Sequence, residues 1–377
     1  MIKIVFLIRS LDFGGSQTQL VTLVKALDPT EFEVTVICFY SEGTLATTLV
    51  ESGIRVLSLE KRGRWDLGRF YGRLSGYLHQ IQPQILHSYL SDPNLLVILL
   101  KPWFPRIAIV WGIRTAQDNL RQYSWFIRLL FWLECRLAGF ADLIIANSQA
   151  GRAFHIAQGF PAAKTITIPN GIDCDLFQPD PQGRVKLRTL WGIPDSVILI
   201  GLVGRLDPLK DHPTFLKAAA LLCQQRRDVH FVCIGSGLDT ADQLQQLATD
   251  LEIADRITWS AARTDVPEVQ NALDIATSCS TSEGFSNVIT EAMACGVPCV
   301  VTDVGDSAWI VGKTGIVVPP ADPQALAAGW QACLAMDRQH LGQLARARII
   351  QHLSVQQLAM TTQDALVSLL QRQTLRF

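Results

Sequence analysis

Two acidic residues in the segment EGFSNVITEAMACGVP, Glu283 and Glu291, have the spacing and surroundings best suited to chemistry. Ser286 is a good helix N-cap, and Gly296 can take the left-handed conformation that ends a helix. We therefore expect a helix over 287–295, with Glu283 in the preceding loop and Glu291 about one and a half turns inside. The free N–H groups of the first turn favour an anion, so the two carboxylates can reach different parts of one elongated ligand.

A second group of candidates lies in the segment GRLDPLKDH, which follows an apolar run. Ligands of open α/β sheets bind beyond the carboxyl ends of the strands, where this loop is expected. Gly204 lets the backbone approach a ligand closely, and Arg205 and Lys210 supply a guanidinium fork and a point charge for a diphosphate. The alternative is two solvated basic residues ahead of a helix.

Near the N-terminus, Gly14-Gly15 separates an apolar run from a helical pattern. The pair suits close backbone approach to a phosphate at a helix start. It lacks the GxGxxG spacing of a dinucleotide-binding turn, which disfavours an NAD site.

The elements that position these residues form two series of short apolar runs alternating with helix-length segments, from IKIVFLI to TITIPNGID and from VILIGLVG to TGIVVPP. Continuous apolar strands separated by helices predict parallel sheets covered on both faces. Turn residues in PNGID and FQPDP mark a boundary between the series. We expect an α/β fold with two Rossmann-like domains, 1–168 and 169–353, and a C-terminal helix over 354–377 that packs back on the first domain.

Composition narrows the functional classes. With 377 residues, 49% hydrophobic, the chain can form two packed cores, and its net charge of −1 without dense basic runs argues against nucleic-acid binding. Nine scattered cysteines indicate neither a disulfide framework nor a zinc site and favour a cytoplasmic location. The longest apolar stretch, from Leu95, is interrupted by charges and prolines too early to span a membrane.

These motifs resemble the retaining glycosyltransferases of the GT-B architecture, in particular glycosyltransferase family 4. The resemblance covers nearly the whole chain and rests on Gly14-Gly15, Ala146-Asn147-Ser148, PNGID, GRLDPLKD and the E-x7-E pattern. It implies two domains facing across a cleft. It also implies transfer of a hexose from a nucleotide-diphosphate sugar to a carbohydrate or lipid-linked acceptor, in synthesis of a surface polysaccharide, lipopolysaccharide or glycolipid.

The resemblance also implies roles for individual residues. Arg205 and Lys210 would hold the donor diphosphate, Glu283 the hydroxyls of the donor sugar, and Glu291 the ribose. The remaining donor contacts would come from backbone groups of Gly15, Gly204, Phe285, Ser286, Asn287 and Val288. Neither an obligatory metal nor another cofactor is implied, and no side chain is assigned as general base.

The chain departs from the family where many members carry a histidine after the strand IVWGI, because Arg114-Thr115 stands there. Arg114 either donates to sugar or phosphate in its place or pairs with Asp118. His87, after another apolar run, either faces the same region or is a packed imidazole.

Basic and aromatic residues mingle in the first domain, which suits peripheral contact with anionic lipid on the inner membrane face and access to a polyprenyl-linked acceptor. The alternative is core aromatic residues beside solvated arginines. The residues are Arg62, Arg64, Trp65, Arg69, Phe70, Arg73, Trp103, Phe104, Arg121, Trp125, Phe126, Arg128 and Trp132.

Two other functions remain open: a nucleotide-sugar 2-epimerase of the same architecture and a non-catalytic subunit that binds sugar nucleotides.

Overall fold

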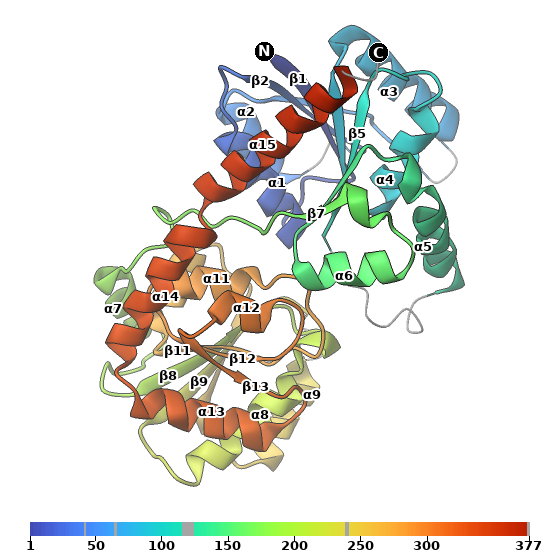
Figure 1. Ribbon diagram of the computed structural model, residues 1–377. Helices are drawn as coiled ribbons and strands as arrows, with labels where there is room; N and C mark the ends of the chain where they lie inside the picture. Colours follow the sequence, from blue (N-terminus) through green and yellow to red (C-terminus); the bar gives the residue numbers. More distant parts are fainter. Residues whose placement is uncertain (41–42, 64–65, 115–123, 238–240, 375–377) are drawn as a thin grey trace. The chain divides into compact units, whose positions relative to one another are not determined.

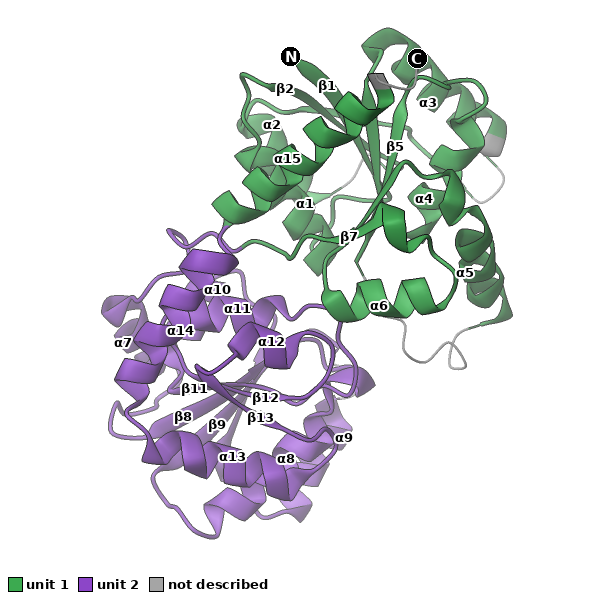
Figure 2. Ribbon diagram, in the orientation of Figure 1, with its two compact units in different colours: residues 1–171, 355–377 green, residues 172–354 purple. Residues whose placement is uncertain are grey.

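The computed structural model divides the chain into two α/β units (Figures 1 and 2). It describes residues 1–40, 43–63, 66–114, 124–237 and 241–374. Unit 1 comprises Met1–Gly171 and Val355–Phe377, and unit 2 comprises Ile172–Ser354. The divisions thus fall after Gly171 and Ser354, within three residues of the expected boundaries. Two parallel-sheet α/β domains were expected from the apolar runs, and that fold class is confirmed.

In unit 1, the described strands form one parallel sheet in the order β3-β2-β1-β4-β5-β6-β7. They are β1 (Ile2–Ile8), β2 (Phe32–Cys38), β3 (Arg55–Ser58), β4 (Ile85–Tyr89), β5 (Ala108–Ile113), β6 (Leu143–Ala146) and β7 (Thr165–Thr167). The helices are α1 (Gly15–Ala26), α2 (Thr44–Glu51), α3 (Leu67–Ile81), α4 (Ser91–Leu100), α5 (Trp125–Leu137), α6 (Gln149–Ala157) and α15 (Val355–Thr374).

Unit 2 contains a second parallel sheet in the order β10-β9-β8-β11-β12-β13. Its strands are β8 (Ile198–Val203), β9 (Val229–Gly235), β10 (Ile257–Ala261), β11 (Ile275–Ser278), β12 (Cys299–Thr302) and β13 (Gly315–Val318). The helices are α7 (Pro181–Leu190), α8 (His212–Cys223), α9 (Ala241–Asp250), α10 (Val266–Ala272), α11 (Asn287–Ala294), α12 (Ser307–Val311), α13 (Pro323–Ala335) and α14 (Arg338–His352).

Hydrophobic cores lie on both faces of each sheet, which is why most strands are predominantly apolar rather than strictly alternating. In β1, for example, every residue from Ile4 to Ile8 is fully buried. The C-terminal helix α15 contributes Leu358, Leu366 and Leu369 to a core of unit 1 and contacts α1. No helix among the described residues has both the length and the apolar character needed to cross a bilayer.

Candidate active site

The sheet order of unit 2 brings two predicted site residues together. Strand β8 is flanked by β9 on one side and β11 on the other, so the loops that leave β8 and β11 meet at the point where the strand order reverses. Lys210 follows β8 and Glu283 follows β11. The Lys210 ammonium donates to Glu283 Oε1, which also accepts a hydrogen bond from Ser280 Oγ at 2.8 Å. The Lys210 ammonium and the Glu283 carboxylate therefore form a partly buried ion pair.

Backbone contacts fix the loop that carries Lys210. The Gly204 amide donates to the Ile234 carbonyl at 2.8 Å, and a Cβ added at Gly235 would lie 1.7 Å from the Gly204 oxygen. Only glycine at position 235 permits this approach. Farther along, Thr281 N–H donates to the Leu209 carbonyl at 2.9 Å and ties the β8 and β11 loops together.

Arg205 is more exposed than Lys210 and Glu283. Its side chain is 73% exposed and pairs with Asp207, 3.2 Å away, rather than with Glu283. An exposed ion pair of this kind contributes little to stability. Separating the Arg205 guanidinium from Asp207 therefore costs little free energy.

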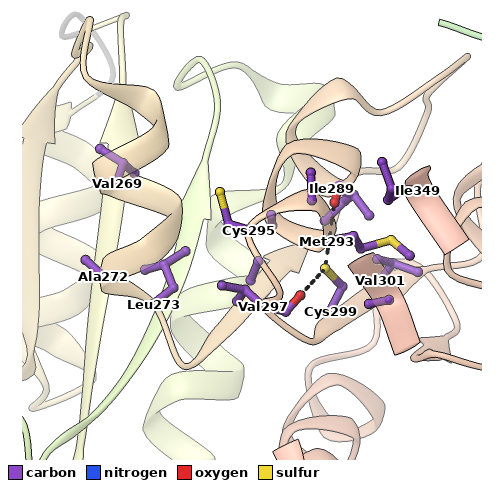
Figure 3. Close-up of a cluster of buried hydrophobic side chains, with 14 of the residues drawn as sticks. Val269, Ala272, Leu273, Ile289, Met293, Cys295, Val297, Cys299, Val301 and Ile349 are labelled. Carbon is purple, nitrogen blue, oxygen red and sulfur yellow. Dashed lines mark hydrogen bonds between the residues drawn. The ribbon is translucent and has the colours of Figure 1, made fainter. Parts of the chain in front are cut away.

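Helix α11 packs against a hydrophobic core of unit 2, and this packing fixes the position of its N-terminus at the site. Figure 3 shows Ile289 and Met293 of α11 in one apolar cluster with Val301 and Ile349. Ser286 occupies the N-cap position, but its side chain makes no capping hydrogen bond. The helix ends at Ala294, one residue before the expected end, and Gly296 has the left-handed φ of 75° predicted for it.

The segment between Glu283 and α11 is partly enclosed by the loop after β12. Gly305 has a φ of 55°, and a Cβ there would lie 2.1 Å from the Glu283 carbonyl oxygen. The next amide, of Asp306, donates to the Gly284 carbonyl at 3.1 Å. Phe285 and Ser286 are buried, whereas Asn287 and Val288 are partly exposed at the helix start. The backbone of the glycine-containing loop is thus fixed by its neighbours.

Glu291 is partly buried inside α11. Burial of its carboxyl group raises the pKa to about 7, although a hydrogen bond with Gln270 lowers it somewhat. Gln270 is itself fully buried, and its amide nitrogen donates to the Val288 carbonyl at 3.4 Å. Gln270 therefore connects Glu291 with the first turn of α11. Gln270 and Ser280 were not predicted as site residues, because a polar residue among apolar neighbours forms no recognisable sequence motif.

In unit 1, the three candidates have different surroundings. Gly15 is the exposed first residue of α1. His87 has no exposed surface, and its ring lies 5.2 Å from that of Phe6. Burial, reinforced by the nearby Arg114 charge, lowers the pKa of His87 well below its ordinary value. These contacts favour the packed-imidazole interpretation.

Arg114 is mostly buried and has two partners in unit 1. Its guanidinium stacks over the Tyr89 ring at 4.3 Å and donates to Asn170 Oδ1 at 3.2 Å. Thr115 and Asp118, the predicted alternative partner, lie outside the described residues.

Arg114 also borders a hollow of about 300 Å³ at the carboxyl ends of β4 and β5. In this hollow, the buried carboxylate of Glu134 accepts hydrogen bonds from Ser91 at 2.7 Å and Asn94 at 3.0 Å. Burial raises the pKa of Glu134, while those hydrogen bonds lower it. Arg9 and Asp92, 3.2 Å apart, also line the hollow. Glu134 was not predicted, since it looks like an ordinary charge on an amphipathic helix.

Within the described ranges, no three His, Cys, Asp or Glu side chains are grouped so as to hold a metal ion. The Asp173-Cys174-Asp175 segment forms a turn, in which the Asp173 carboxylate accepts from the amides of Asp175 and Leu176, both at 3.0 Å.

Comparison with known protein families finds a matching family model for each half of the chain. The model for "Glycosyltransferase Family 4" matches residues 13–176, and that for "Glycosyl transferases group 1" matches residues 198–336. A D-inositol 3-phosphate glycosyltransferase of Mycobacterium marinum is 34% identical over 234 residues, which are 60% of this chain and 49% of that protein. Its counterpart in Geodermatophilus obscurus is 34% identical over 208 residues, which are 52% of this chain and 46% of that protein. The chain thus spans about half the length of the curated relatives it matches.

Solved structures resemble this chain over a longer span than the curated relatives do. The Anabaena protein HepE, crystallised with UDP, superposes with a TM-score of 0.86 at 25% identity, covering 97% of this chain and all of that one. HepE with UDP-glucose gives a TM-score of 0.84 at the same identity, over 98% of this chain and all of that one. With a family 4 domain followed by a group 1 domain, both on parallel α/β sheets, this chain belongs to the GT-B glycosyltransferases of family 4.

Proposed function

We propose that this protein moves a hexose, with retention of anomeric configuration, from a nucleotide-diphosphate sugar to a carbohydrate or lipid-linked acceptor. The observation that carries the proposal is the Lys210–Glu283 pair at the switch point of unit 2, beside the N-terminus of α11. Because HepE was crystallised with UDP and UDP-glucose, uracil is the proposed base of the donor.

The pair suggests how donor binding prepares the reaction. A diphosphate at the α11 N-terminus would attract Lys210 and Arg205, and Glu283 Oε1 would then accept from a sugar hydroxyl instead of from Lys210. As the anomeric bond breaks, negative charge grows on the diphosphate, and the two bound cations stabilise it without a metal. The leaving oxygen can take the acceptor proton, so no side chain is needed as a base.

The hollow of unit 1 is the proposed acceptor site. Its buried Glu134 and its Arg9–Asp92 pair offer acceptors and donors to hydroxyl groups. A saccharide or a polyprenyl-linked saccharide, used in surface polysaccharide or glycolipid synthesis, has that chemistry. We place the protein peripherally at the inner face of the membrane, where such acceptors are presented.

A thermal-shift screen against UDP, GDP, ADP and their sugar conjugates, with and without EDTA, tests the donor site. A nucleotide at about 100 times its Kd should add about 2.7 kcal/mol of stability, and we expect this for UDP in EDTA. Glu283→Gln should lower turnover about 100-fold or more while the UDP shift remains. Glu252→Gln, an exposed change in the same unit, is the matched control.

Other results would identify the competing functions. Release of a free sugar isomer and UDP without acceptor would indicate the 2-epimerase. UDP binding without turnover for any saccharide acceptor would indicate a binding subunit, and unchanged turnover in Glu283→Gln would refute the role of that carboxylate.

A further inference from the structure

Helix α5 of unit 1 exposes large apolar side chains that a helix on a folded domain normally buries. Trp125 is 74% exposed, Phe126 53%, Leu129 42% and Trp132 51%. Trp125, Leu129 and Trp132 recur at helical spacing and form one stripe, while Phe131 and Glu134 are buried on the other side. Figure 1 shows α5 at the margin of the unit.

Three of the other aromatic and basic candidates in this domain have conventional roles. Phe70 is a core residue, and Arg73 pairs with Glu60 at 2.6 Å. Phe104 is partly buried and packs against the His79 ring at 4.8 Å. Arg64, Trp65 and Arg121 lie outside the described residues. Arg62, Arg69 and Trp103 are also exposed, and Trp103 contacts the Tyr71 ring at 5.9 Å. Among the described residues, however, several exposed aromatic side chains occur together on one helix only in α5.

The charge on this helix has one sign. Arg128 and Arg136 are exposed, and the single acid of α5, Glu134, is buried with its own hydrogen-bond partners. The Arg136 guanidinium lies over the Trp132 ring at 5.2 Å. Both arginines line an open hollow of about 530 Å³, which has no carboxylate in its lining.

We propose that α5 docks on an anionic membrane. Trp125, Phe126, Leu129 and Trp132 would enter the headgroup region, where amphipathic indoles are favoured, and Arg128 and Arg136 would bind lipid phosphates. A protein partner would explain the apolar stripe equally, but the exclusively basic charge and the hollow between the arginines fit lipid phosphates better. The inference deepens the proposed peripheral location, and it can be tested without the donor reaction.

The test is co-sedimentation of the full chain with vesicles of phosphatidylcholine alone or with about one third phosphatidylglycerol. We expect binding to the anionic vesicles that weakens at high salt. A W125S/L129S/W132S variant should bind at least about tenfold more weakly, and R128E/R136E should lose more than tenfold on anionic vesicles. The matched control is V185S/L190S, which removes exposed apolar side chains from α7 and should bind like the wild type.

Three results would overturn the proposal: no binding of the wild type to either vesicle, equal binding by the α5 variants, or equal loss in the α7 control. Self-association that depends on α5, without vesicle binding, would assign the stripe to a second copy instead. UDP-induced stabilisation of each variant is measured separately. A variant that UDP still stabilises is folded and has an intact donor site. If such a variant no longer binds vesicles, its defect lies in membrane docking.

Discussion

Glu283 and Glu291 lie in one loop and helix but differ in what surrounds their carboxyl groups. Glu283 has a cationic partner in Lys210 and a hydroxyl donor in Ser280. Glu291 has only an uncharged partner, Gln270, against the cost of burial. Proton-linked behaviour near neutral pH is therefore expected of Glu291.

We predict that Glu291 makes both stability and nucleotide binding depend on pH. Its pKa is raised from 4.5 to about 7, so the folded state holds a proton that the unfolded state has lost between these values. The free energy of unfolding should fall as the pH rises from about 4.5 to 7, by at most about 3 kcal/mol, less the effect of partial exposure. Thermal denaturation at several pH values measures this fall, and Glu291→Gln should remove it.

If Glu291 binds ribose hydroxyls as proposed, the ionised carboxylate is the better acceptor, since it has more free lone pairs. The Kd for UDP, measured by calorimetry, should then decrease between pH 6 and pH 8 in the wild type and stay flat in Glu291→Gln. A pH dependence that persists in the variant would show that another group is responsible.

At the scale of elements, the strands were the easiest feature to predict. Runs such as VHFVCIG are mostly apolar because parallel strands are buried on both faces, and this run forms β9. The meeting of Lys210 with Glu283 depends on the strand order, which local pattern does not encode. The sequence left open whether the aromatic residues of α5 face a membrane or a core, because its apolar residues also have the spacing of a helix that packs on a core.

The sequence also does not show where the backbones of two elements approach each other closely. The contact of Gly342 in α14 with Gly296 provides a test. A Cβ at this position would lie 1.9 Å from the Gly296 carbonyl oxygen, just after α11. Helix propensity alone predicts that alanine is stabilising by about 1 kcal/mol. We expect Gly342→Ala to destabilise by about 2 to 4 kcal/mol instead, because backbone must move to relieve the overlap.

The matched control is Gly76→Ala in α3, an exposed helical glycine with no atom within 4 Å of its added Cβ. It should gain up to about 1 kcal/mol in denaturant unfolding. If both variants gained stability, α14 would not pack on the Gly296 turn as described.

For the whole molecule, one of the two units is discontinuous in sequence. Unit 1 is made from the first 171 residues together with α15, which follows unit 2 in the chain. Each unit has its own cores, and among the described residues each core cluster belongs to one unit. The two units are therefore expected to unfold as separable cooperative transitions.

This arrangement predicts that a change near the C-terminus destabilises the unit formed by the N-terminus. Leu366 of α15 is fully buried in the unit 1 core with residues of β1 and α1. Leu366→Ala should cost about 2 to 5 kcal/mol through lost burial and the cavity left behind. Met360→Ala, an exposed change in the same helix, should stay within about 0.5 kcal/mol of the wild type. Hydrogen exchange resolved by segment would show faster opening of β1, α1 and α15 in Leu366→Ala, whereas β8 and β11 should keep their protection. Equal loss of protection in both sheets would mean that the two units unfold as one, and that α15 stabilises the chain as a whole.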